Sequence, residues 1–182
     1  MIALAFVAAC GGTGGTATQT PGPVAPLTGA PTAAAASASI NLPSAEELCA
    51  LLTATDWGQF DYVTTPQPEV NTDGPGSAYC TYAGESGSAD GLELDSFVGE
   101  TVADAEETFD LITSGSDGDG KQITLPGADE AFVDASIDGE FGAIVVRTGR
   151  FTYTVSLPTS EQAEAQLLAL AGIVLGRSTT LR

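Results

Sequence analysis

After residue 43, the spacing of hydrophobic positions changes repeatedly between that of helices and that of strands. In three segments the apolar residues recur every three or four positions, which places them on one face of a helix. Each segment opens with a Ser or Thr followed three residues later by Glu, Asp or Gln, the pattern of a capping box. The spacing predicts helices from about 44 to 54, from about 101 to the residues before Ser114, and from about 159 to 176, with the caps Ser44 and Glu47, Thr101 and Asp104, and Thr159 and Gln162.

Between these segments apolar and polar residues alternate, as in half-buried strands. The alternation is clear over 92–95 and 151–157, whereas 143–146 is apolar on both faces. Asp138-Gly139 and Thr148-Gly149 are expected to be tight turns, so 121–157 is predicted to form a meander of about four antiparallel strands. The order of helices and strands favours a single α+β domain over 43–182, an antiparallel sheet flanked by about three helices.

The first 42 residues have a different composition. Residues 10–42 are dominated by Gly, Ala, Pro and Thr and are expected to form a disordered, flexible linker. A Gly-rich coil of this length has a root-mean-square reach on the order of 30 Å. Residues 1–9 are apolar and are interpreted as a signal peptide that is truncated or whose true start lies upstream, because they contain no Lys or Arg. A buried N-terminal strand is the alternative, although the linker offers it no partner.

The apolar run ends in Val7-Ala8-Ala9-Cys10-Gly11, with small residues before the cysteine. This resembles the lipobox of bacterial lipoproteins, in which the cysteine is lipidated and becomes the mature N-terminus. The resemblance implies that Cys10 carries a lipid anchor. It also implies a location on the extracytoplasmic face of the cell membrane, because the acyl chains give stable attachment.

Charge and composition exclude several classes of function. The chain has 24 acidic and 5 basic residues, a net charge of −19, so it repels phosphate backbones and we expect no nucleic-acid partner. It contains no histidine, which excludes Ser-His-Asp triads, Cys-His dyads and HExxH zinc sites. We expect a monomer without a cofactor or a metal.

Cys49 and Cys80 are the two remaining cysteines. In an exported domain such a pair is most simply a disulfide, which would contribute roughly 3 to 4 kcal/mol by closing the loop between them. Two buried free thiols are the alternative, and they would indicate an intracellular protein.

Acidic residues offer two further candidate sites. Asp138 and Glu140 have nearly the spacing that glycosidases need, but they flank a predicted turn and should be well solvated. Asp117-Gly118-Asp119-Gly120 is similar to the start of a calcium loop, but Lys121 occupies the third ligand position, so a flexible acidic turn is the better interpretation of Asp117 and Asp119. Glu106, Glu107 and Asp110 are expected on the solvent face of the second helix.

Three aromatic residues follow the first predicted helix: Trp57, Phe60 and Tyr62. They could form a stacking platform for a sugar or a peptide, with Trp57 the first candidate to line a pocket. Their spacing is more typical of core residues that seal a helix against a sheet.

Several short motifs together resemble one family, the small lipoproteins of high-G+C Gram-positive bacteria that carry an uncharacterised extracytoplasmic domain. The motifs are Leu48-Cys49-Ala50-Leu51-Leu52-Thr53, Cys80 with Tyr82, Leu125-Pro126-Gly127-Ala128-Asp129-Glu130-Ala131-Phe132, and Arg147-Thr148-Gly149-Arg150 before an Ala-rich helix. The resemblance covers about residues 43 to 176 and implies a cell-envelope location and a disulfide, with no known activity. The expected fold is also similar to the PsbP-like fold, an analogy at the level of fold alone.

The residues favour a non-catalytic module that binds a ligand or a protein partner in the cell envelope. A secreted hydrolase that uses paired carboxylates is the alternative. A purely structural or stress-related surface protein is a third interpretation, which the sequence does not separate from the first.

Overall fold

A computed structural model describes residues 41–82, 91–115, 120–137 and 140–181. All of these belong to one compact unit that spans 39–182. Within these ranges no helix is long and apolar enough to cross a membrane.

The unit is built on a seven-stranded antiparallel sheet, which confirms the predicted α+β class. The strands lie in the order β1-β2-β3-β7-β6-β5-β4, so the last strand in the sequence pairs with β3 at the centre. Their bounds are Glu69–Asn71 (β1), Ser77–Thr81 (β2), Glu93–Val98 (β3), Lys121–Gln122 (β4), Glu130–Ile137 (β5), Phe141–Thr148 (β6) and Phe151–Pro158 (β7). The predicted meander from 121 to 157 is therefore β4 to β7.

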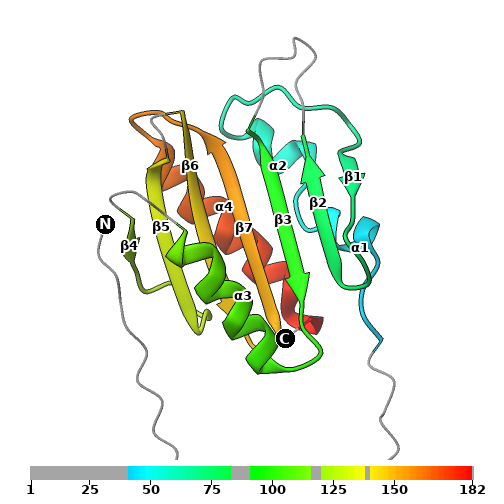
Figure 1. Ribbon diagram of the computed structural model, residues 1–182. Helices are drawn as coiled ribbons and strands as arrows, with labels where there is room; N and C mark the ends of the chain where they lie inside the picture. The colour runs from blue at the N-terminus through cyan, green and yellow to red at the C-terminus, as the bar shows by residue number, and fades with distance from the viewer. Residues whose placement is uncertain (1–40, 83–90, 116–119, 138–139, 182) are drawn as a thin grey trace, which may run out of the picture. The chain divides into compact units, whose positions relative to one another are not determined.

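The helices pack on both faces of this sheet (Figure 1). Helix α4 (Ala163–Arg177), followed by a short 3-10 turn (Ser178–Thr180), packs against β5, β6 and β7 on one face, and α1 (Ala45–Cys49) packs against β1 and β2. On the other face, α3 (Val102–Ser114) packs over β6 and β7 and reaches β3. The helices thus cover most of one face of the sheet and a smaller part of the other.

The predicted helix over 44–54 is wrong in its extent, because the segment forms two short helices. Helix α1 ends at Cys49, and a second capping box begins α2 (Ala54–Gly58) at Thr53. Thr53 is extended, and its side chain and that of Asp56 exchange bonds with each other's backbone N–H, which stops a continuous helix at this residue. The box at Ser44 and Glu47 is confirmed.

The helix predicted from 101 is confirmed, with Thr101 and Asp104 forming its capping box. The helix predicted from 159 begins later, at Ala163, and Gln162 forms no side-chain cap. The reason lies in the sheet, because Pro158 still pairs with Phe141 and the Thr159 N–H donates to the Glu140 carbonyl oxygen at 2.9 Å.

The main core lies between the sheet and the layer formed by α1, α2 and α4. Its largest fully buried side chains include Trp57, Tyr82, Tyr153 and Phe151. The hydroxyl groups of two of them are satisfied internally, since Tyr153 donates to the Ala171 carbonyl oxygen and Tyr82 to that of Cys49, both at 2.7 Å. These bonds tie α4 and the end of α1 to the sheet and leave neither tyrosine hydroxyl unpaired.

Candidate functional site

The two cysteines form the predicted disulfide, which joins the end of α1 to β2. Cys49 and Cys80 are bonded, with their Cα atoms 5.6 Å apart, and both side chains are buried. Tyr82 lies two residues beyond Cys80, and the hydroxyl that donates to the Cys49 carbonyl oxygen also lies 3.2 Å from that of Leu52. The crosslink is therefore part of the core, which gives it a structural role.

Trp57, Phe60 and Tyr62 belong to the core or its margin. Trp57 is fully buried, and its ring contacts those of Tyr82 and Tyr62 with centroids 5.3 Å and 6.3 Å apart. Phe60 and Tyr62 are half-buried against the core, and the Tyr62 hydroxyl donates to Gln166 Oε1 at 2.9 Å. Burial raises the pKa of Tyr62. Trp57 has no exposed ring face, so it cannot act as a stacking platform.

Several candidate residues lie outside the described residues: Cys10, Asp117, Asp119 and Asp138. Glu140 is described and is exposed, as are Glu106, Glu107 and Asp110 on α3. In the described ranges, no group of three or more His, Cys, Asp or Glu side chains is arranged to hold a metal ion.

Two of the sequence motifs meet around Arg147. Its side chain is only 9% exposed, and Nε donates to Glu130 Oε2 at 2.7 Å while Nη1 contacts Asp129 Oδ2 at 3.3 Å. Asp129 Oδ2 also accepts the Gly149 backbone N–H at 2.7 Å, which holds the turn between β6 and β7. Glu106 of α3 lies 3.8 Å from Arg147 Nη2. The acidic pair Asp129-Glu130 is therefore a structural counterion set for a buried guanidinium.

Gly149 and Arg150 form the two-residue turn itself, between the paired residues Thr148 and Phe151. This is one residue later than the predicted turn at Thr148-Gly149. Gly149 has a φ of +57°, a conformation that glycine adopts without strain.

The other basic side chains of the described ranges also have internal partners. Lys121 pairs with Glu164 at 3.0 Å, and Arg150 Nη1 donates to the Gly99 carbonyl oxygen at 3.1 Å. Arg177 binds Asp56. Each described cation is thus committed to a contact within the domain.

The described surface contains two shallow pockets next to α1. One, of about 230 Å³, lies over the disulfide and is lined by residues of α1, α2 and the segment before β1, including Glu46, Pro66 and Pro68. The other, of about 260 Å³, lies beside Arg177 and Leu181. Small-molecule sites usually enclose roughly 300 to 1,000 Å³ and bring several polar groups together. Neither pocket meets this description.

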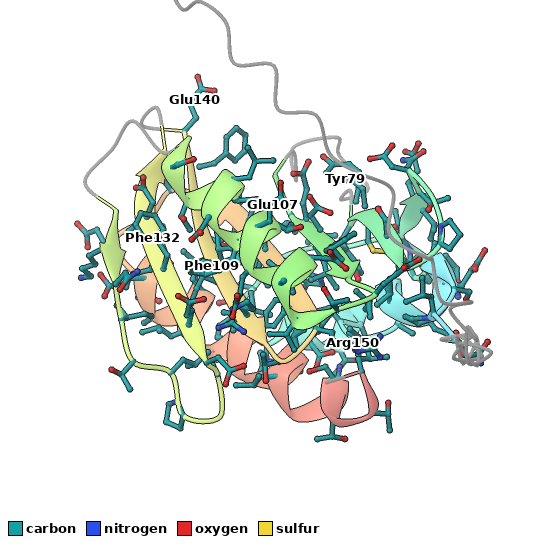
Figure 2. The ribbon with its side chains drawn as sticks, turned by 60° about the horizontal axis from the view of Figure 1, so that its bottom comes forward. Tyr79, Glu107, Phe109, Phe132, Glu140 and Arg150 are labelled. Atoms are coloured by element: carbon teal, nitrogen blue, oxygen red, sulfur yellow. A yellow bond between two sulfur atoms is a disulfide. The ribbon has the colours of Figure 1, made fainter. Side chains whose placement is uncertain are left out.

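The part of the sheet that α3 leaves uncovered is the stronger candidate. On β2, β3 and β7 several side chains that point away from the main core are exposed or half-buried, either beside the edge of α3 or further from it. We call this surface the open sheet face, and its members are Ser77, Tyr79, Thr81, Glu93, Asp95, Phe97, Thr154 and Ser156. Tyr79 is 38% exposed and lies to the side of α3 (Figure 2).

Cross-strand register arranges this face in rows. Tyr79, Asp95 and Thr154 are opposite one another on β2, β3 and β7, and Thr81 and Glu93 form the next row. Side chains opposite each other in antiparallel strands are close enough to interact directly. The rows therefore place an aromatic ring beside two carboxylates.

The electrostatics of this face are unusual for an exposed surface. The Tyr79 hydroxyl donates to Glu93 Oε1. Burial and this carboxylate raise the pKa of Tyr79 to about 12. Burial of its carboxyl group and the negative charges of Asp73 and Glu93 raise the pKa of Asp95, and a hydrogen bond from the Ser96 backbone N–H offsets only part of this rise. Perturbed groups of this kind tend to gather at functional sites.

Sequence reasoning did not identify the open sheet face. The alternation in Leu92-Glu93-Leu94-Asp95 does place Glu93 and Asp95 on the same face of a strand. The sequence does not show which strand pairs with this one. The segment Ser77–Thr81 carries a recognisable signal only at Cys80. Comparison with family models, with curated proteins and with solved structures finds no match for this chain.

Proposed function

We propose that this chain is a lipoprotein anchored to the extracytoplasmic face of the cell membrane, whose domain is a non-catalytic binding module of the cell envelope. The open sheet face is its binding surface. The observation that carries this proposal is the incomplete cover of the sheet, since α3 shields β6 and β7 while Tyr79, Glu93 and Asp95 remain accessible.

The shape of the surface favours a protein partner over a small molecule. The pockets beside α1 are below the usual size of ligand sites, whereas a broad, polar sheet face suits a macromolecular contact. An exposed Tyr supports this, because Tyr is enriched at interfaces, where its ring packs and its hydroxyl stays hydrated.

Anchoring depends on Cys10 and on the resemblance to a lipobox. A Cys10→Ser variant of the full chain should move from the membrane fraction to the soluble fraction. Mass spectrometry of the native protein should find acyl chains on Cys10 and no residues before it. An unmodified N-terminus would contradict the anchor and, with it, the proposed location.

The binding surface can be tested in intact cells with a photo-crosslinking residue, p-benzoylphenylalanine, in place of Tyr79. A matched variant carries the same residue in place of Glu161, which is exposed next to α4. We expect discrete crosslinked products from position 79 and none from position 161. Equal products from both positions, or none from either, would contradict a binding role for the open sheet face.

A carboxylate hydrolase remains the second candidate, because one observation favours it. Glu93 and Asp95 lie on the same face of β3, two residues and so roughly 7 Å apart along the strand. This is within the range of inverting glycosidases, in which one carboxyl has a raised pKa, as Asp95 does. Both lie on an open face, where water is not excluded. Hydrolysis of cell-wall glycans that is lost in both Glu93→Gln and Asp95→Asn would establish this function in place of the first.

A further inference from the structure

We propose that the open sheet face binds an extended, Lys- or Arg-rich polypeptide segment of its partner. This inference rests on the proposed function and specifies the chemistry of the partner. Three features of the described residues support it: carboxylates without an ion-pair partner, a fixed aromatic ring and a side-chain-sized hollow beside Glu93.

Within the described ranges, the two carboxylates of this face have no counterion. Neither Glu93 nor Asp95 forms an ion pair with a described Lys or Arg. The described cations Lys121, Arg147, Arg150 and Arg177 are engaged elsewhere. A cationic partner could therefore pair with these carboxylates without breaking an existing ion pair.

The two carboxylates also repel each other. They occupy alternate positions of one strand, and Asp is among the residues least favoured in strands. A surface that served only to keep the domain soluble could carry its charge on loops and on α3, where Glu107 and Asp110 are exposed. A positive group placed between Glu93 and Asp95 would turn this repulsion into attraction.

Tyr79 adds an aromatic surface to the charge. Its hydroxyl is held by Glu93, so the ring is oriented before any partner binds. Lys and Arg side chains are attracted to aromatic faces within about 6 Å of the ring centre. A ring held beside two carboxylates therefore suits a guanidinium or an ammonium group.

A hollow adjoins each carboxylate. One, of about 220 Å³, is lined by Thr81, Gly91, Glu93 and Phe141. Gly91 is required there, since a Cβ at this position would lie 2.0 Å from the Phe141 ring. A smaller niche of about 30 Å³ lies between Asp95 and Phe97 on the strand and Thr108 and Ile112 of α3. The larger hollow is below the usual size of a ligand site but can receive one side chain of an extended chain, whereas the niche beside Asp95 has room for little more than a water molecule.

The probe for the test is a synthetic decapeptide of alternating lysine and alanine, titrated into the full chain by calorimetry at low ionic strength. The neutral control is the same peptide with every lysine acetylated. The site variant is Glu93→Gln with Asp95→Asn. The matched variant, Glu46→Gln with Glu161→Gln, removes the same charge from exposed positions near α1 and α4, on the other side of the sheet.

We expect the lysine peptide to bind and the acetylated peptide not to bind. The site variant should weaken binding at least tenfold, and the matched variant less than twofold. Amide shifts in an NMR titration of the unaltered chain should gather on β2 and β3, a readout that does not depend on the folding of a variant. Absent binding, equal weakening by both variants, or shifts spread over the whole surface would overturn the inference.

Failure here and failure of the proposed function are distinguishable. Crosslinking from position 79 without any binding of the lysine peptide would mean that the face binds a partner of different chemistry. That result would overturn the inference of a cationic segment and leave the proposed binding function standing.

Discussion

Arg177 at the end of α4 forms a two-pronged contact with Asp56 of α2, with Nη1 2.6 Å from Oδ2 and Nη2 2.9 Å from Oδ1. The same guanidinium donates to the Leu51 carbonyl oxygen at 2.8 Å. Asp56 also accepts the backbone N–H of Thr53 in the α2 capping box. The Arg177 side chain therefore joins α4 to α2 and to the segment between the two short helices.

Replacing Arg177 with Lys should lower the free energy of unfolding by about 1 to 3 kcal/mol, because a single ammonium cannot reproduce the planar, paired contact and the bond to Leu51. The control is Lys121→Gln, which removes the exposed pair with Glu164 and should cost about 0 to 1 kcal/mol. Chemical denaturation at pH 7 measures both variants. Equal losses of stability in the two variants would show that the Arg177 contact stabilises the fold no more than an exposed ion pair does.

The Asp56 contact should also appear in the pH dependence of stability. Burial by itself raises the pKa of Asp56, but the bonds from Arg177 and Thr53 and the charge of Arg177 outweigh it, so the pKa lies below the ordinary value of 3.8. The ionised carboxylate thus stabilises the folded state above about pH 3.8, and this contribution is lost as pH falls through the lowered pKa. The stability difference between the unaltered chain and Asp56→Asn should shrink in that acidic range, and a constant difference down to pH 2 would contradict the lowered pKa.

Reduction of the Cys49–Cys80 disulfide should lower the free energy of unfolding by roughly 3 to 4 kcal/mol, since the crosslink limits the freedom of the unfolded chain. Trp57 is the only tryptophan and is buried against Tyr82, so its fluorescence reports unfolding. A Cys49→Ala, Cys80→Ala variant should match the reduced chain and should not respond to reductant. A response in that variant would show that the reductant acts elsewhere.

Around Arg147 the cost of a substitution should depend on which partner is removed. Arg147 is buried, whereas the side chains of Asp129 and Glu130 are 52% and 36% exposed. Arg147→Met leaves carboxylates that water can reach, while Asp129→Ala with Glu130→Ala leaves a buried cation whose remaining ion-pair partner in the described part of the chain is Glu106, 3.8 Å away. The double variant should therefore lose more stability than Arg147→Met in urea denaturation, and the reverse order would contradict a counterion role for the acidic pair.

Asp95→Asn should raise stability at pH 7. Burial, with the charges of Asp73 and Glu93, raises the pKa of Asp95, so its ionised form is disfavoured in the folded state. The unaltered chain gains the same benefit only when the pH falls through the raised pKa towards 3.8, where Asp95 is protonated. The advantage of the Asn variant should then vanish. A variant less stable than the unaltered chain at pH 7 would show that the hydrogen bond from the Ser96 backbone N–H, which favours the ionised carboxylate, outweighs burial and repulsion.

Local pattern was sufficient for most secondary elements. Ser44 and Thr101 were identified as helix caps because the bonds involved span only three residues. The meander from 121 to 157 followed from alternation and short turns, and its neighbours in sequence are neighbours in the sheet. The start of the last helix was misplaced because of a tertiary contact, since the Thr159 N–H donates to the Glu140 carbonyl oxygen. The break at Thr53 instead has a local cause, the second capping box with Asp56.

The candidate site required the folded chain. Alternation along β3 indicates that Glu93 and Asp95 share a face, but that pattern is the same whichever strands lie beside it. Pairing of β3 with β2 and β7 brings Tyr79 and Thr154 next to Asp95, across separations that no local rule covers. The position of α3 then leaves those side chains uncovered, because packing over the whole sheet, and not the composition of any one strand, determines which part of a face meets water.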